Sequence, residues 1–143
     1  MPIVTLSPAG PTTVASFPPN YFLENFALRA DNSALITALN QKELWYVPPS
    51  EATQSVKPIL LHTFDQLTLN LVEVELDVFY LTTSNGYTDH KSSLDRIDLR
   101  KWSAEDPIQP QKVFDFPKEA RVHSTAVASL VPIPFLLATQ SLA

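Results

Sequence analysis

Short apolar runs alternate with polar turns along almost the whole chain. Three of these runs are alike, at 35–39, 79–83 and 135–139, and their starts lie 44 and 56 residues apart. Repeats of about 40 to 50 residues that hold several short strands are typical of β-propeller blades. No segment keeps a helical period for more than two turns, so the pattern favours an all-β fold over the helical classes.

The apolar runs fall into successive units. The first unit has runs at 26–29, 35–39, 43–47 and 59–64, the second at 71–74, 78–83, 94–99 and 112–116, and the third at 125–128 and 136–139. We therefore predict an all-β chain of β-propeller blades, each of four antiparallel strands, with two complete blades and one that stops after its second strand.

The same pattern sets the domain boundaries. Residues 1–19 hold five prolines and are expected to form an extended N-terminal arm, which Phe17 would anchor. Blade one spans about 21–64, blade two about 69–117 and the partial blade three about 122–143. The chain has two glycines, so its tight turns are expected to rely on Asn, Asp and Pro.

Composition narrows the function classes. Apolar residues make up 45% of the chain and charged residues 17%, which suits a globular core. The net charge of −5 and the scattered Lys and Arg predict no nucleic-acid partner. The chain has no cysteine, which excludes a disulfide framework, a thiolate metal site and a Cys nucleophile within it.

The ends of the chain bear on its location. Met1–Val4 shows neither a basic n-region nor a long apolar h-region, and the sequence has no Asn-x-Ser/Thr sequon, so we expect a cytoplasmic protein. Val122–Ala143 lacks charged residues and is long enough for a membrane helix. Pro132 and Pro134 would break such a helix, so we predict two strands joined by a turn, and no membrane partner.

Two and a half blades would leave an open arc. The last strands would present unpaired backbone groups and an apolar face. We therefore expect a truncated propeller that self-associates through its open blade edges.

The segment Phe22–Arg29, FLENFALR, followed by Leu35–Thr37 and Glu43–Val47, resembles the opening blade of the SMP-30/gluconolactonase-like six-bladed β-propellers. Val113–Ala120 fits the same pattern. The resemblance covers roughly residues 17–143 and implies about two and a half blades of six. It is closer to a fungal branch from natural-product gene clusters, which includes hetero-Diels–Alderases.

The resemblance implies a site at the propeller axis. In metal-dependent lactonases of this superfamily, a Glu on the first blade and two later Asn or Asp residues hold a divalent cation, which prefers oxygen ligands. Glu24 lies where that Glu is expected, whereas His123-Ser124 replaces the Asn that opens the inner strand of the third blade. Glu24 and His123 are therefore the catalytic candidates, both expected to point towards the axis, and we expect no metal and no cofactor.

Each candidate has a plainer interpretation. Glu24 could hydrogen-bond turn amides near the axis, and His123 could line a pocket without doing chemistry. Asp89, His90 and Asp95 could be taken for a metal cluster, but a solvated loop fits their spacing better. His62, within an alternating strand, is expected to be structural, and neither a Gly-x-Ser-x-Gly motif nor a phosphate-binding loop occurs.

The resemblance implies a fungal secondary-metabolite enzyme, a cofactor-free cyclase of the hetero-Diels–Alderase type. Its partner would be a small apolar biosynthetic intermediate, and catalysis would work by positioning and hydrogen-bond polarisation. The alternatives are a metal-dependent lactone hydrolase and a non-catalytic truncated propeller.

Overall fold

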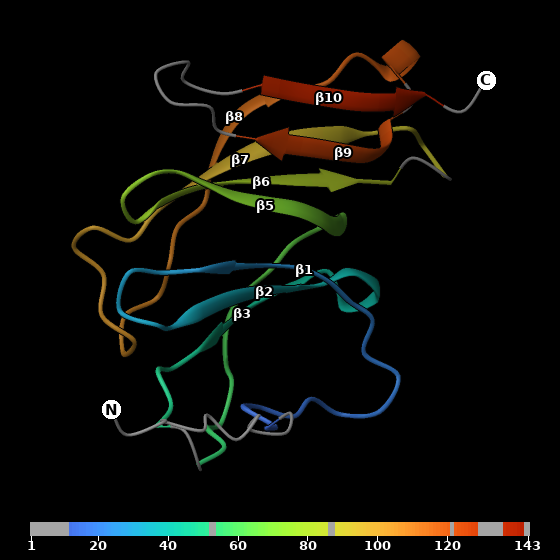
Figure 1. The fold of residues 1–143 in the computed structure, drawn as a ribbon. Coiled ribbons are helices and arrows are strands. Elements are labelled where there is room, and N and C mark those ends of the chain that lie inside the picture. The colour runs from blue at the N-terminus through green and yellow to red at the C-terminus, as the bar shows by residue number, and fades with distance from the viewer. Residues whose placement is uncertain (1–11, 52–53, 86–87, 121, 129–135, 142–143) are drawn as a thin grey trace, which may run out of the picture.

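The computed structural model describes residues 12–51, 54–85, 88–120, 122–128 and 136–141. In these ranges the chain folds into two four-stranded antiparallel sheets and a third, two-stranded sheet (Figure 1). Within each four-stranded sheet the strands are paired in the order of the sequence, because short turns connect neighbours directly. The predicted all-β fold and its strand order are confirmed for the described residues.

The strands have the following bounds. The first sheet holds β1 (Leu23–Leu28), β2 (Ala34–Ala38), β3 (Glu43–Val47) and β4 (Ile59–Thr63), the second holds β5 (Leu67–Glu75), β6 (Val78–Ser84), β7 (Ser92–Asp98) and β8 (Gln111–Asp115), and the third holds β9 (Val122–Ala128) and β10 (Leu136–Ser141). Two 3-10 turns, η1 (Leu39–Gln41) and η2 (Lys118–Ala120), complete the elements. The three similar apolar runs of the sequence are β2, β6 and β10, the second strand of each sheet.

The main core lies between the first and second sheets. Its buried side chains come from both sheets and from the β7–β8 connection: Leu35, Leu44, Tyr46, Leu71, Phe79, Leu81, Ile97, Leu99 and Ile108. A smaller cluster of Leu94, Phe116 and Tyr80 covers the other face of the second sheet. Because side chains alternate along a strand, the second sheet is apolar on both faces, as a sheet between two others must be.

Tight turns between strands use non-glycine residues in the left-handed conformation. Asn32 between β1 and β2 has a φ of 66°, and Asp77 between β5 and β6 has a φ of 59°. Asn and Asp tolerate this region through local hydrogen bonds, as the sequence predicts. Lys42 and His90 also have positive φ values, which the sequence did not indicate.

The first strand of each sheet begins earlier than predicted. β1 begins at Leu23 rather than at residue 26, β5 at Leu67 rather than at 71, and β9 at Val122 rather than at 125. Each strand contains a register shift near its start. In β1 and β9 the extra residue of the bulge breaks the alternation of polar and apolar residues, so the pattern stopped there although the strand does not. In β5 the sequence alternates from Leu67 to Leu71, and this signal was missed.

The described part of the arm has no regular secondary structure before a turn at residues 19–20, and Phe17 packs on the first sheet. The Phe17 ring packs edge-on against Trp45, with centroids 5.5 Å apart, and lies 6.3 Å from the Tyr21 ring. These rings cover part of the outer face of the first sheet.

In the described parts of the charge-free segment, residues 122–128 and 136–141, the chain forms strands. β9 and β10 pair antiparallel from Leu136↔Ala128 to Ser141↔Val122, whereas Pro132 and Pro134 lie outside the described residues. In the described ranges, no helical segment has the length and apolar character needed to cross a bilayer.

Candidate ligand-binding site on the first strands

The first strands of the three sheets lie next to one another. β5 contacts β1 on one side and β9 on the other, and all three strands begin at the same end of the molecule (Figure 1). A register shift lies near the start of each of these three strands, at this end.

One extra residue interrupts the pairing near the start of each first strand. In β1 this residue is Glu24, and in β9 it is His123. In β5, Leu69 and Asn70 lie opposite Thr82 alone. Bulges redirect side chains and are frequent next to functional sites. The two catalytic candidates of the sequence therefore occupy matching positions in different sheets.

Two asparagines at these bulges, Asn25 and Asn70, make matching hydrogen bonds. Neither was a candidate site residue from the sequence. The Asn25 amide N–H donates to Thr37 Oγ1 at 3.0 Å, and the Asn70 amide N–H donates to Thr82 Oγ1 at 3.2 Å. Asn25 Nδ2 also donates to Asn70 Oδ1 at 3.3 Å. This last bond joins the first two sheets at their bulges and holds two carboxamides side by side.

Buried threonine hydroxyls hold these strands in place. Thr37 Oγ1 on β2 donates to the Leu69 carbonyl at 3.0 Å, and Thr68 Oγ1 on β5 donates to the Ala38 carbonyl at 3.1 Å. Both threonines are fully buried. A bulge leaves backbone groups without their ladder partners, and these hydroxyls satisfy such groups across the sheet interface.

Glu24 is exposed, and its carboxylate makes no hydrogen bond or ion pair with another described residue. Hydrogen bonding to turn amides, the plainer role considered for it, is therefore not observed within the described ranges. An unengaged carboxylate can accept a hydrogen bond from a ligand hydroxyl.

The His123 backbone belongs to β9, whereas its side chain lies outside the described part of the structure. The direction in which the imidazole points therefore remains a prediction.

A cavity of about 250 Å³ opens between the loops at the same end of the sheets. It is lined by Lys42 after η1, Leu67 at the start of β5, and Asn85 and Thr88 in the β6–β7 loop. The Lys42 ammonium donates to the Asp65 carbonyl at 2.9 Å, which ties the β2–β3 turn to the approach to β5.

The structure separates the other polar candidates. Asp89 lies in an exposed loop and accepts a hydrogen bond from the Lys91 amide, whereas Asp95 is buried on β7 and accepts one from Ser93 Oγ at 3.3 Å. Burial raises the pKa of Asp95, while the Ser93 hydrogen bond and the charges of Lys112 and His62 oppose that rise. Across the described ranges, no group of three or more His, Cys, Asp or Glu side chains could hold a metal ion.

His62 fits its structural interpretation. Its ring lies on β4 in edge-on contact with Phe64, with centroids 4.6 Å apart.

The sequence did carry a signal for the Asn25–Asn70 pair. The two asparagines are 45 residues apart, close to the length of the repeat, and each directly precedes an apolar run.

No protein-family model matches the chain, and no curated protein and no solved structure is significantly similar to it. Function is therefore inferred from the fold and from the geometry of the site.

Proposed function

We propose that the three sheets are successive blades of a β-propeller of the SMP-30/gluconolactonase-like type, and that the bulged ends of β1, β5 and β9 line its axial pocket. In this pocket the protein would bind a reactive apolar intermediate and steer its cyclisation without a cofactor. The observation that carries the proposal is the repeated bulge, with Glu24 and His123 at matching positions and Asn25 joined to Asn70.

Sequential four-stranded sheets with adjacent first strands support the blade interpretation. In a propeller, the first strand of each blade lies nearest the central channel. The contacts of β5 with both β1 and β9 are those expected of three neighbouring blades. The axial end would then carry the polar groups of the bulges within a largely apolar wall.

The chemistry suits a hetero-Diels–Alder reaction. Two σ bonds form between a C=C–C=O unit and an alkene, the three π bonds of the reactants are reduced to one, and no proton, electron pair or leaving group is lost. The enzyme has to bring both partners together and withdraw electron density from the heterodiene carbonyl. The side-chain Nδ2 groups of Asn25 and Asn70 can donate to that carbonyl, while Glu24 accepts from a hydroxyl on the same substrate.

One observation favours lactone hydrolysis as a second candidate. The Glu24 carboxylate and the side-chain oxygens of Asn25 and Asn70 belong to neighbouring bulges, and all are hard oxygen donors of the kind that calcium prefers. A cation there would polarise an ester carbonyl and activate water.

A model cycloaddition tests the first proposal. The purified chain is mixed with an ortho-quinone methide generated in solution and an electron-rich alkene, and the enantiomeric excess of the adduct is measured by chiral chromatography. The uncatalysed reaction gives a racemate, whereas we expect an excess with the protein. Asn70→Ala should lower the protein-catalysed rate of adduct formation about tenfold. This is the loss expected for one polarising hydrogen bond.

The control is Gln54→Ala, which removes an exposed carboxamide in the β3–β4 connection and should leave the enantiomeric excess unchanged. A racemic product at the uncatalysed rate contradicts the cyclase. Calorimetric titration with calcium and zinc tests the alternative: micromolar binding that Glu24→Gln abolishes would favour the lactonase. Failure of both assays would favour a non-catalytic scaffold.

A further inference from the structure

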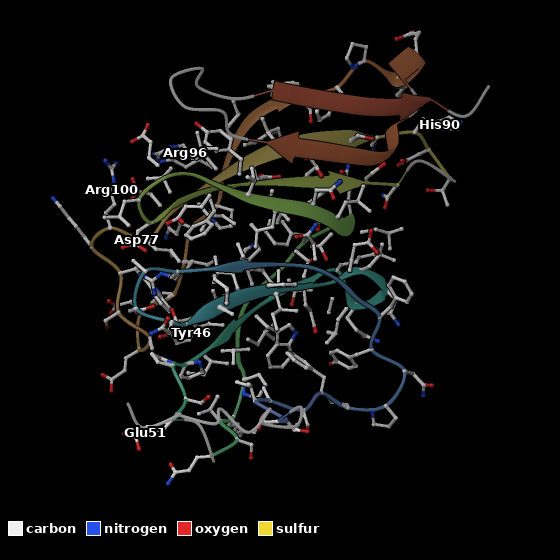
Figure 2. The ribbon with its side chains drawn as sticks, viewed as in Figure 1. Tyr46, Glu51, Asp77, His90, Arg96 and Arg100 are labelled. Atoms are coloured by element: carbon white, nitrogen blue, oxygen red, sulfur yellow. The ribbon has the colours of Figure 1, made fainter. Side chains whose placement is uncertain are left out.

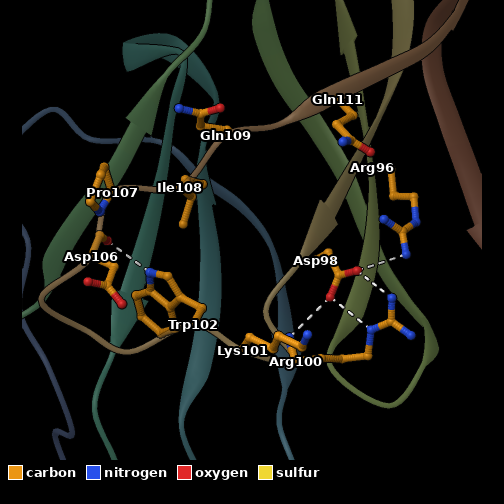
Figure 3. A pocket seen from close by; sticks show the side chains of 10 residues that line it. All are labelled: Arg96, Asp98, Arg100, Lys101, Trp102, Asp106, Pro107, Ile108, Gln109 and Gln111. Atoms are coloured by element: carbon orange, nitrogen blue, oxygen red, sulfur yellow. Dashed lines mark hydrogen bonds and ion pairs between the residues drawn. The ribbon is translucent and has the colours of Figure 1, made fainter.

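A second hollow lies at the opposite end of the second sheet from the start of β5. Arg96 and Arg100 are at the end that holds Asp77, and His90 is at the other end (Figure 2). At the end that holds Asp77, the end of β7 and the β7–β8 connection line an open pocket of about 880 Å³ (Figure 3). This volume lies in the range of small-molecule sites.

One wall of this pocket is basic. Three of the chain's ten Lys and Arg residues line it, namely Arg96, Arg100 and Lys101. Asp98 bridges the two guanidinium groups: Arg96 Nη2 donates to it at 3.0 Å, and Arg100 donates through Nε at 2.9 Å and Nη2 at 2.6 Å. These hydrogen bonds engage fewer than half of the N–H groups of the two guanidiniums.

Hydrogen bonding by Arg100 holds the pKa of Asp98 well below its ordinary value, so the carboxylate remains ionised at neutral pH. It neutralises one of the two arginines and holds the pair together. Asp106 stands on the facing side. With three cations and two carboxylates, the pocket keeps a net charge of +1 in a protein whose net charge is −5.

Beside Asp106, the facing wall carries the apolar groups of Trp102, Pro107 and Ile108 (Figure 3). The Trp102 ring packs edge-on against Tyr46, with centroids 5.0 Å apart, and its indole N–H donates to the Asp106 carbonyl at 2.9 Å. An aromatic surface held in this way can contact a planar ligand.

Local hydrogen bonds order the connection that carries this wall. The Ser103 amide N–H and Ser103 Oγ both donate to Asp106 Oδ2, at 3.3 and 3.2 Å, and the Asp106 amide N–H donates to the Ser103 carbonyl at 2.9 Å. Ile108 is buried in the main core. The wall is therefore preorganised, which reduces the entropy cost of binding a ligand.

We propose that this pocket binds a small organic monoanion in which a carboxylate is joined to a flat apolar group. The carboxylate would lie on the guanidinium groups of Arg96 and Arg100, whose planar donor pairs match its two oxygens. The apolar group would lie against Trp102 and Ile108. The net charge of +1 favours a monoanion over a phosphate dianion, and the apolar wall favours an organic acid over an inorganic anion.

The two tryptophans allow a direct test in the full chain. The indole ¹H–¹⁵N cross-peaks of Trp102 and Trp45 are followed by NMR during titration with 2-naphthoate. We expect the Trp102 peak to shift saturably at millimolar ligand, while the Trp45 peak, from the outer face of the first sheet, stays in place. Arg100→Gln should weaken binding about tenfold, the effect of losing one charge-assisted contact.

Two further variants separate a binding role from a structural one. Asp98→Asn removes the internal competitor for the guanidiniums and should strengthen binding about threefold. Lys91→Gln removes one positive charge in an exposed loop and should leave binding within about twofold of the original, since screening limits long-range effects.

The unchanged Trp45 peak reports that each variant is folded. The proposal is overturned if 2-naphthoate leaves the Trp102 peak unmoved. It is also overturned if the neutral methyl ester binds equally well, or if Arg100→Gln binds like the original chain.

Discussion

Asp95 shows how a single residue can oppose the stability of the fold that holds it. Its side chain is 8% exposed and shares a strand face with Ile97 of the main core. Ser93 Oγ donates to it and also lies 2.8 Å from Thr83 Oγ1. These hydroxyls compensate only in part for the lost water, so the pKa of Asp95 stays raised.

The raised pKa of Asp95 predicts a pH dependence with a definite sign. Between the ordinary pKa of the unfolded chain and the raised pKa of the fold, the folded protein binds more protons, so stability falls as pH rises through this window. Asp95→Asn should remove that fall, because Asn can still accept the Ser93 hydrogen bond. We expect a higher free energy of unfolding than in the original chain at pH 7, measured by urea denaturation, and a smaller difference in acid.

The control for this prediction is Asp65→Asn, an exposed position where the same change should be nearly neutral at both pH values. An Asp95→Asn variant that is less stable at pH 7 would show instead that the ionised carboxylate stabilises the fold.

At the scale of elements, β8 is the least protected strand of the second sheet. It pairs with β7 alone, and all five of its residues are exposed, with Val113 at 47% and Phe114 at 40%. Lys112 and Asp115 form an ion pair at 3.1 Å on this strand. Charged residues at an edge disfavour pairing with another chain, but the apolar residues between them favour it.

We therefore expect the chain to self-associate through β8. The variant Val113→Lys should weaken this association about tenfold. It should change the free energy of unfolding by less than about 0.5 kcal/mol. Sedimentation velocity over a range of concentrations measures the effect. Val14→Lys is the matched control, since Val14 is equally exposed, at 46%, but lies in the N-terminal arm. A chain that stays monomeric throughout would rule out association at this edge.

For the molecule as a whole, one ion pair links the turns of the two large sheets. Arg29 Nε donates to Asp77 Oδ1 at 2.9 Å across 48 residues of sequence, and its side chain is 9% exposed. The Arg29 guanidinium also lies 5.8 Å from the centre of the Trp102 ring, which adds a cation–π contact. The pair thus joins the first sheet, the second sheet and the β7–β8 connection.

Breaking this pair should cost more than breaking a surface pair. We expect Arg29→Met and Asp77→Asn each to lower the free energy of unfolding by about 1–3 kcal/mol, because either change leaves a poorly hydrated polar group behind. A double-mutant cycle by chemical denaturation should give a coupling of at least about 1 kcal/mol.

The exposed pair of Lys91 and Asp89, 3.8 Å apart, provides the comparison. Its coupling should be close to zero, because water screens both charges. Equal coupling in the two pairs would mean that Arg29 and Asp77 do not hold the sheets together.

The sequence by itself determined the all-β class, the order of the strands and the second strand of each sheet. Alternation and turn residues are local properties, and the runs at β2, β3 and β6 follow them without interruption. The sequence also indicated Glu24 and His123, although only through a resemblance.

Tertiary structure alone decided the bulges, the Asn25–Asn70 bond, the Arg29–Asp77 pair and the basic pocket. A bulge breaks the alternation by which a strand is recognised, so the starts of β1 and β9 were hidden, whereas the start of β5 alternates in sequence and was missed. The side chains of both pairs are more than 40 residues apart in sequence and meet only when one sheet packs on another, which no local pattern encodes.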